Sequence, residues 1–161
     1  MEVKYKLIVK ENLSSKDISN FGDALKEQNE VHGNPYSKAE KCTCICFAIA
    51  DDEIIGIGGI KDGFKESVFK KAHQELCKNS MLYKYELGYI YSKIEGEGVA
   101  STITKKLISK MKNEKLYATT RLHTNIGMVK ILRKNGFIHT GKTWESVKTI
   151  GDEIGLFLKK N

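Results

Sequence analysis

The sequence is poor in arginine and in long apolar runs, and each shortage argues against a class of protein. Arg121 and Arg133 are the only arginines among 161 residues, whereas proteins that read base edges favour the bidentate guanidinium group. No stretch approaches the roughly 20 apolar residues of a membrane-spanning helix, and the first residues lack the apolar run of a signal peptide. We therefore expect a cytoplasmic protein that does not bind a membrane.

Length and charge indicate one lysine-rich domain. A chain of 161 residues, 40% of them hydrophobic, fits a single domain over 1–161, and no repeat, linker or low-complexity tract interrupts it. The formal net charge of +7 would attract a polyanion, but the lysines are dispersed, which is typical of a solvated surface. The dispersed pattern argues against a nucleic-acid partner, which is kept only as an alternative. The same positive field would help to collect a ligand that carries several phosphates.

Three of the four cysteines are expected to be small apolar fillers. Cys42, Cys44 and Cys46 alternate along a predicted strand and would therefore share one face of it. Structural zinc ligands usually lie two to four residues apart on turns, so the three cysteines favour no metal site. Cys77 stands alone.

Hydrophobic periodicity predicts an α/β arrangement. Alternating residues predict strands at 3–9, 42–50, 53–60, 83–91, 116–122, 137–144 and 154–158. Three-to-four spacing predicts a helix from Ser14 or Ser15 to about Gln28, another over 64–77, and one each after Gly98 and Asn125. Asp51-Asp52 predicts an antiparallel hairpin, and the segment 29–38 is predicted to be a loop.

The most informative segment runs from Tyr85 to Ser101, where a predicted strand passes through Gly96 and Gly98 into a helix. Glycines let a backbone approach a ligand closely, and the first N–H groups of a helix lack intrahelical acceptors and point at an anion. The arrangement suits a pyrophosphate, although a Gly-x-Gly turn is also typical of an ordinary strand-to-helix connection. It matches neither the P-loop signature nor the dinucleotide fingerprint.

A second segment has a more specific pattern. Asn125 is followed by an apolar helix, Lys134 and the pair Gly136-Phe137, with Gly141 shortly after. Together with the glycine turn and the order of strands, this string resembles the GNAT superfamily of acyl-CoA-dependent N-acetyltransferases over most of the chain. The resemblance implies the GNAT fold: a mixed, mostly antiparallel sheet of about seven strands, helices on both faces, and splayed parallel strands four and five.

The resemblance also implies acetyl-CoA as co-substrate. The backbone of the fourth strand, from Tyr89 to Ser92, would hold the acetyl carbonyl and the pantetheine. Asn125 would face the pantetheine arm, although the residue alone is also a helix cap whose side-chain oxygen accepts from the backbone. The implied cofactor-binding residues are Tyr91, Ser92, Lys93, Glu95, Gly96, Glu97, Gly98, Val99, Ala100, Ser101 and Asn125.

Three features depart from the family pattern. Lys93 falls where relatives carry Gln or Arg at the head of the glycine motif, and the loop before the glycines is short. Glu95 and Glu97 flank Gly96, so backbone N–H groups would have to dominate phosphate binding. Leu132 stands where the family often has the tyrosine that acts as general acid, and leucine cannot donate a proton.

Direct transfer to an amine requires a base. Glu86, which resembles the glutamate that several family members use, is the predicted catalytic residue; the alternative is a strand residue paired with a lysine. Other proton carriers by residue type are Tyr85, Tyr89, Tyr91, His123 and His139.

The acceptor and the assembly are less well defined. The resemblance places a small-molecule or peptide amine near 27–38 and 63–77, where Glu27, Glu30, His32 and Tyr36 could contact a cationic acceptor. The sequence leaves open whether the protein forms a homodimer. It also leaves open the alternative function of a non-catalytic module that binds CoA or nucleic acid.

Overall fold

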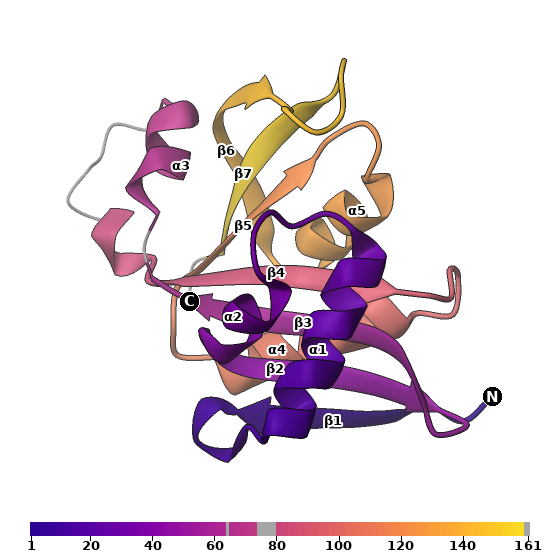
Figure 1. Cartoon of the computed structure of the whole chain (residues 1–161). Helices are drawn as coiled ribbons and strands as arrows, with labels where there is room; N and C mark the ends of the chain where they lie inside the picture. The colour runs from indigo at the N-terminus through magenta and orange to yellow at the C-terminus, as the bar shows by residue number, and fades with distance from the viewer. Residues whose placement is uncertain (64, 74–79, 160–161) are drawn as a thin grey trace. The chain divides into compact units, whose positions relative to one another are not determined.

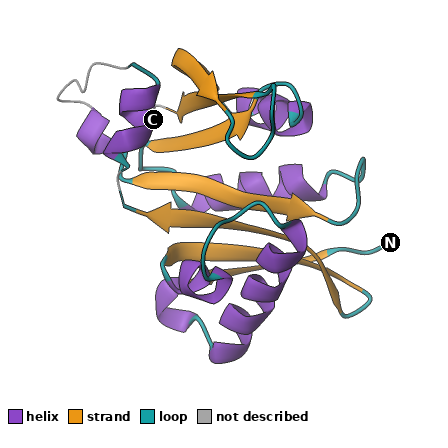
Figure 2. Cartoon of the chain, turned by 45° about the horizontal axis from the view of Figure 1, so that its top comes forward, coloured by secondary structure: helices purple, strands orange, loops and turns teal. Residues whose placement is uncertain are grey.

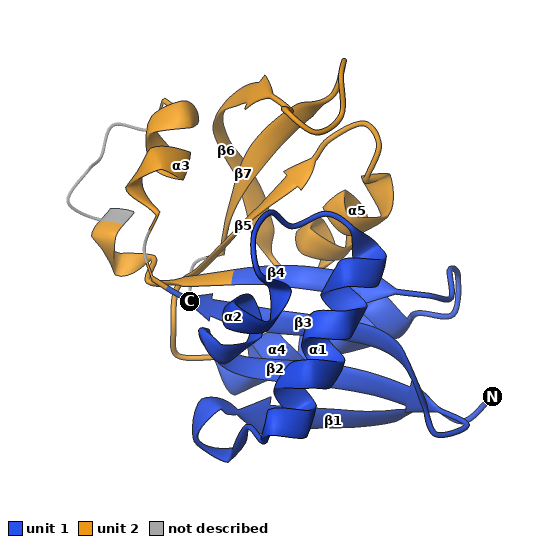
Figure 3. Ribbon diagram, in the orientation of Figure 1, with its two compact units in different colours: residues 1–62, 87–111 blue, residues 63–86, 112–161 orange. Residues whose placement is uncertain are grey.

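The computed structural model describes residues 1–63, 65–73 and 80–159, and these form two compact units (Figure 3). Unit 1 comprises 1–62 and 87–111, and unit 2 comprises 63–86 and 112–161. Strand β4, Tyr85–Ser92, begins in unit 2 and continues in unit 1. The prediction of a single domain over 1–161 is not decided by this division and stays a prediction.

The strands of unit 1 follow the predicted hairpin pattern. β1 (Lys4–Val9), β2 (Cys42–Ala50) and β3 (Glu53–Asp62) pair antiparallel in this order. Asp51 and Asp52, between β2 and β3, have φ angles of 49° and 63°. Short Asp side chains tolerate this left-handed conformation, which closes a two-residue hairpin with the twist of the strands. The predicted hairpin is therefore confirmed.

Helices cover both faces of these strands (Figures 1 and 2). After the short 3-10 helix η1 (Lys10–Asn12), α1 (Ser15–Gln28) begins at a capping box in which Ser14 accepts from the Asp17 N–H at 3.1 Å. α1 packs Phe21 and Leu25 against Phe47 of β2 in the main core of the unit. On the opposite face, α4 (Val99–Lys110) packs against β2 and β3.

The predicted loop over 29–38 is wrong in its second half. α2 spans Pro35–Glu40, and the Asn34 side chain caps it by accepting from the N–H groups of Tyr36 at 2.9 Å and Ser37 at 3.2 Å. Proline suits the first helical position because its missing N–H would have no intrahelical acceptor there. Asn-Pro therefore starts a helix in this chain.

The three cysteines of β2 are buried as expected, but they do not share one face. Between β2 and β3 the register shifts, since Cys42 lies opposite Lys61 while Cys44 lies opposite Ile60. Two residues on β2 thus advance against one on β3, which is a β-bulge. Cys42 consequently joins the core beneath α1, and Cys44 and Cys46 are not part of that core. Both are buried, and burial raises the pKa values of their thiols to about 11. The predicted common face is wrong for Cys42.

Unit 2 contains the remaining elements. They are α3 (Glu66–Lys71), η2 (Ser80–Leu82), β5 (Leu116–Arg121), α5 (Ile126–Lys134), β6 (Phe137–Glu145) and β7 (Glu153–Lys159). β7 pairs antiparallel with both β5 and β6, and α5 packs against β5 and β6. α3 packs through Phe69 on Tyr117 of β5, with ring centroids 5.4 Å apart.

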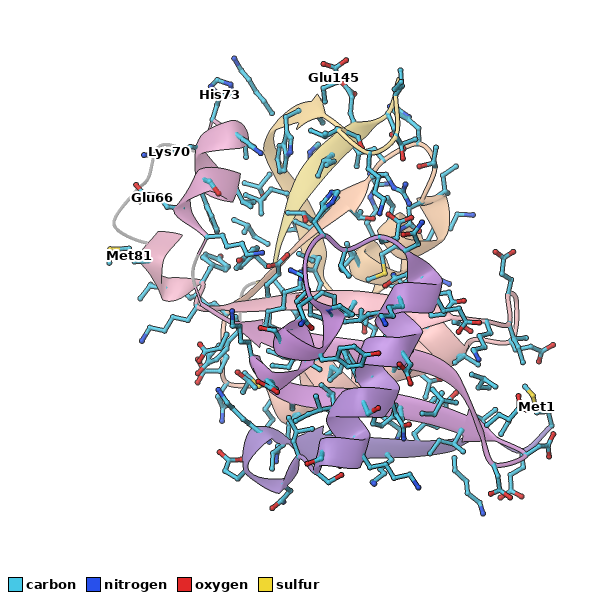
Figure 4. All side chains as sticks on the ribbon, in the orientation of Figure 1. Met1, Glu66, Lys70, His73, Met81 and Glu145 are labelled. Atoms are coloured by element: carbon cyan, nitrogen blue, oxygen red, sulfur yellow. The ribbon has the colours of Figure 1, made fainter. Side chains whose placement is uncertain are left out.

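The helix predicted over 64–77 is shorter in the structure. Within α3, Glu66 and Lys70 form an ion pair at 3.3 Å, and both are labelled in Figure 4. Residue 64 and residues 74–79, including Cys77, lie outside the described residues. α5 buries Val129 and Leu132, whereas Met128 and Ile131 are only half-buried.

The strands have the order β1-β2-β3-β4-β5-β7-β6 in a seven-stranded sheet. β4 and β5 are parallel, with Tyr85 beside Leu116 and Glu86 beside Tyr117. The mixed, mostly antiparallel α/β fold predicted from the sequence is confirmed.

Candidate active site

In unit 1, β4 runs into a turn whose glycines adopt the left-handed conformation. Gly96 has a φ angle of 81° and Gly98 has one of 73°. Gly98 caps α4, and its carbonyl accepts from the Thr102 N–H at 2.9 Å. The N–H groups of Val99, Ala100 and Ser101 belong to the first helical turn, which has no intrahelical acceptor for them. The turn therefore directs several backbone donors outward, as an anion requires.

Two glycines of β3 let α4 approach the strand closely. A Cβ atom on Gly58 would lie 2.5 Å from Ile103 and 2.6 Å from Ile90, and one on Gly56 would lie 2.9 Å from Val99. Such distances are below van der Waals contact, so larger residues would push α4 away from β3. Gly56 and Gly58 therefore fix where the N-terminus of α4 stands relative to β3.

The residues around the glycine turn contact neighbouring parts of unit 1 or are exposed. Lys93 pairs with Glu27 of α1 at 3.3 Å, and its backbone N–H donates to the Ile55 carbonyl at 2.8 Å. The Ser92 hydroxyl donates to the Ile94 carbonyl at 2.7 Å. Glu95 and Glu97 are exposed. The expectation that backbone N–H groups dominate phosphate binding at this turn stays a prediction.

Strand β4 contains a backbone irregularity that the sequence did not indicate. Tyr89 has a φ angle of 59°, although it is neither glycine nor a short polar residue. Its ring contacts Phe21 edge-on at 6.0 Å, and the Lys61 ammonium lies 4.2 Å from its centroid. The Ile90 carbonyl accepts from the side chain of Gln28 at 3.3 Å. The strand predicted to hold the acetyl group is thus locally distorted.

In unit 2, Glu86 is buried with 4% of its surface exposed. Its carboxylate accepts from the Tyr117 hydroxyl at 3.3 Å and pairs with Lys65 at 3.6 Å. Tyr117 is fully buried, and this burial, followed by the charge of Glu86 and its hydrogen bond, raises the pKa of Tyr117 far above its usual range. Tyr117 therefore stays neutral and donates to Glu86. The structure thus contains the lysine pair that was the alternative to a base.

Asn125 caps α5 by position but not by its side chain. The side-chain amide donates to the Thr120 hydroxyl at 3.2 Å and makes no capping hydrogen bond. The expectation that its oxygen accepts from the first turn of the helix is therefore wrong. Leu132 is fully buried in α5.

Sequence reasoning missed Asp152, which lies just before β7 with 2% of its surface exposed. Its carboxylate accepts from the backbone N–H groups of His123 at 3.0 Å and Thr124 at 2.9 Å, and also from the Thr124 hydroxyl. Burial alone would raise the pKa of Asp152, but these hydrogen bonds and one from Glu153 lower it well below its usual range. The signal that could have indicated it, an Asp in a Gly-Asp turn, is common.

Three of the other predicted proton carriers and acceptor contacts have partners within their own unit. His123 lies 3.6 Å from Glu153 at the surface, and His139 packs its ring on Phe157 with centroids 5.3 Å apart. Tyr36 donates to Asp23 at 2.6 Å and stacks over Gly22.

Among residues 1–63, 65–73 and 80–159, no group of three or more His, Cys, Asp and Glu side chains could hold a metal ion. Within the same ranges, no helix combines the length and the apolar character needed to cross a membrane.

The chain is similar to known proteins in its structure, whereas comparisons of its sequence find no match. No protein-family model matches the chain, and no curated protein sequence matches it. An acyl-CoA N-acyltransferase from Pseudomonas aeruginosa is similar with a TM-score of 0.70 and 9% identity, covering 99% of this chain and 100% of the other.

Two other solved structures are similar to the chain over nearly its full length. Arabidopsis thaliana Naa50, in complex with the bisubstrate analogue CoA-Ac-MVNAL, has a TM-score of 0.69 and 14% identity over 98% of this chain and 99% of the other. A GNAT-family acetyltransferase from Bacillus cereus has a TM-score of 0.64 and 19% identity over 98% of each chain. The chain therefore has the fold of the GNAT superfamily, as the sequence resemblance predicted.

Proposed function

We propose that the protein is an N-acetyltransferase that moves the acetyl group of acetyl-CoA to a primary amine. The observation that carries the proposal is the left-handed Gly96 and Gly98 turn between β4 and the start of α4, on a chain with the GNAT fold. The similar Arabidopsis structure contains a CoA-based bisubstrate analogue. This supports a CoA ligand for the same fold here.

Residues of both units would bind acetyl-CoA. In unit 1, the N–H groups from Gly98 to Ser101 would bind the pyrophosphate, because they are the free donors of α4. The β4 backbone from Tyr89 to Ser92 would bind the acetyl and pantetheine groups, and the left-handed Tyr89 supports this role because strained backbone clusters at functional sites. In unit 2, Asn125 would contact the pantetheine arm. Acetyl-CoA, when bound, supplies an electrophilic thioester carbonyl.

Glu86 is the proposed base. A neutral amine must lose a proton during attack, and a buried carboxylate can accept it directly or through a water molecule. Tyr117 orients the carboxylate by donating to it, while Lys65, with 54% of its side chain exposed, can move away at small cost. The usual general acid is missing, because the buried Leu132 stands in its place and cannot donate a proton. The leaving thiolate would therefore take its proton from solvent.

The acceptor is proposed only as a class. A small-molecule or peptide amine is compatible with the fold, and the Arabidopsis analogue carries a peptide. The test is a screen of small amines, polyamines, aminoglycosides and peptide N-termini with acetyl-CoA, read by thiol release.

The outcomes of the screen separate the two classes of function. Release that depends on one class of amine supports the enzyme. CoA binding without release with any amine would favour a non-catalytic CoA-binding module, the alternative that Leu132 keeps open. A protein that neither binds CoA nor releases thiol would refute both.

A further inference from the structure

Asp152 connects two segments of unit 2 that are distant in sequence. One carboxylate oxygen accepts from the N–H groups of His123 and Glu153, at 3.0 and 2.7 Å. The other accepts from the Thr124 N–H at 2.9 Å and from its hydroxyl. All four partners are donors, so the site is built for a carboxylate.

The segment held by Asp152 leads directly to Asn125. Leu122 donates its N–H to the Glu153 carbonyl at 2.9 Å, so residues 122–124 continue the contact between β5 and β7 up to the start of α5. Asn125 follows, with its side chain fixed on Thr120 at 3.2 Å. The loop has no helix or strand pairing of its own at 123–125. Its conformation therefore depends on Asp152.

The turn that contains Asp152 is itself tightly hydrogen-bonded. The Asp152 N–H donates to the Thr149 carbonyl at 3.2 Å, and its carbonyl accepts from the Ser146 N–H at 2.9 Å. Arg121 donates to the Thr149 hydroxyl at 2.6 Å. The carboxylate is thus presented from a turn fixed at both ends, which makes it a suitable support for the loop.

We infer that Asp152 is a positioning residue for CoA binding, because its carboxylate holds the backbone of His123 and Thr124 and thereby places Asn125 at the start of α5. The inference rests on the proposed function, in which Asn125 contacts the pantetheine arm. Asp152 itself touches no reacting atom and acts through the loop.

Asp152→Asn is the direct variant. Asparagine keeps the size of the side chain but replaces one acceptor oxygen by an amide that donates, so at least one backbone N–H of His123, Thr124 or Glu153 must face another donor. Losing a hydrogen bond to a charged group, with the partner left buried, should change the equilibrium between the held and the open loop by about tenfold. Thr124→Val, which removes only the hydroxyl donor, is a milder second variant in case Asp152→Asn does not fold.

Asp17→Asn is the matched control. Asp17 is also a buried carboxylate, with 8% of its surface exposed, and it also accepts a backbone N–H, that of Ser14 at 3.0 Å. It caps α1 and belongs to unit 1. A general effect of losing a buried carboxylate should therefore appear in both variants, whereas an effect on the loop should appear only in Asp152→Asn.

Two measurements test the inference. Amide hydrogen exchange without CoA should become about tenfold faster at His123 or Thr124 in Asp152→Asn, and calorimetry should show about tenfold weaker CoA binding. Asp17→Asn should lower the melting temperature and leave both quantities at the wild-type value. Thr124→Val should shift both in the same direction as Asp152→Asn, but less.

Several results would overturn the inference. Unchanged exchange at His123 and Thr124 would show that Asp152 does not hold the loop. Faster exchange with wild-type CoA affinity would show that the loop does not serve the cofactor. A wild-type protein that binds no CoA would instead refute the proposed function, while the exchange rates would still decide whether Asp152 holds the loop.

Discussion

Replacing Glu86 by glutamine separates a catalytic base from a structural ion pair. The glutamine side chain can still accept from the Tyr117 hydroxyl, which lies 3.3 Å from the carboxylate, but it cannot take a proton. We expect kcat to fall about 100-fold, since a positioned base contributes roughly 10²–10⁴-fold, while CoA affinity stays unchanged. The pair with Lys65 at 3.6 Å has one largely exposed partner, so its loss should cost at most about 1 kcal/mol of unfolding free energy.

The assay is steady-state thiol release with the acceptor found in the amine screen, measured from neutral to alkaline pH. Raising the pH should partly rescue Glu86→Gln, because the amine then loses its own proton in solution. Lys65→Met is the matched control, since it breaks the same ion pair and leaves the carboxylate in place. Wild-type turnover in Glu86→Gln, or an equal loss in Lys65→Met, would refute the assignment and leave Glu86 as a structural partner of lysine.

Three further predictions concern packing, acid stability and ligand class. Gly58→Ala should lower the unfolding free energy by about 1–3 kcal/mol in denaturant titration, because its Cβ would lie 2.5 Å from Ile103; an unchanged midpoint would contradict the close packing of α4 on β3. Burial would raise the pKa of Asp152, but hydrogen bonds from Thr124, His123 and Glu153 lower it below the ordinary 3.8, so its stabilisation is present above that pH and is lost as pH falls. Between about pH 4 and pH 2, the melting temperature should thus fall more steeply in wild type than in Asp152→Asn, and parallel curves would contradict this. Acetyl-CoA should raise the melting temperature by mass action, whereas duplex DNA at physiological salt should not; a salt-dependent DNA effect without a CoA effect would favour a nucleic-acid-binding module.

The elements of this fold were predictable where local signals agree. The Ser14 cap and the Asp51-Asp52 turn each combine a residue suited to its backbone conformation with an adjoining apolar pattern. The helix α2 was missed although Asn34 and Pro35 are a helix-start signal, because six residues give too little periodicity to compete with a loop pattern.

The features that the sequence did not predict depend on tertiary contacts. The bulge that turns Cys42 to the other face is set by pairing with β3, and the left-handed Tyr89 is supported by Phe21 and Lys61. The hydrogen bonds of Asp152 reach a loop about 28 positions earlier in the chain, a spacing that no local pattern carries. The glycine turn was predicted from its own Gly-x-Gly pattern, whereas the role of Asn125 toward CoA comes from family resemblance alone, and both assignments to a CoA site stay predictions.

The central claim is tested most directly by titration calorimetry of acetyl-CoA with the wild-type protein, Gly98→Val and Gly136→Val. Both glycines have left-handed φ angles, 73° and 83°, so a β-branched residue should strain the two backbones similarly. We expect wild type and Gly136→Val to bind acetyl-CoA and folded Gly98→Val to bind it at least about tenfold more weakly, because the new side chain blocks close approach of the pyrophosphate to α4. Equal affinity in folded Gly98→Val, or no binding by wild type, would contradict the account.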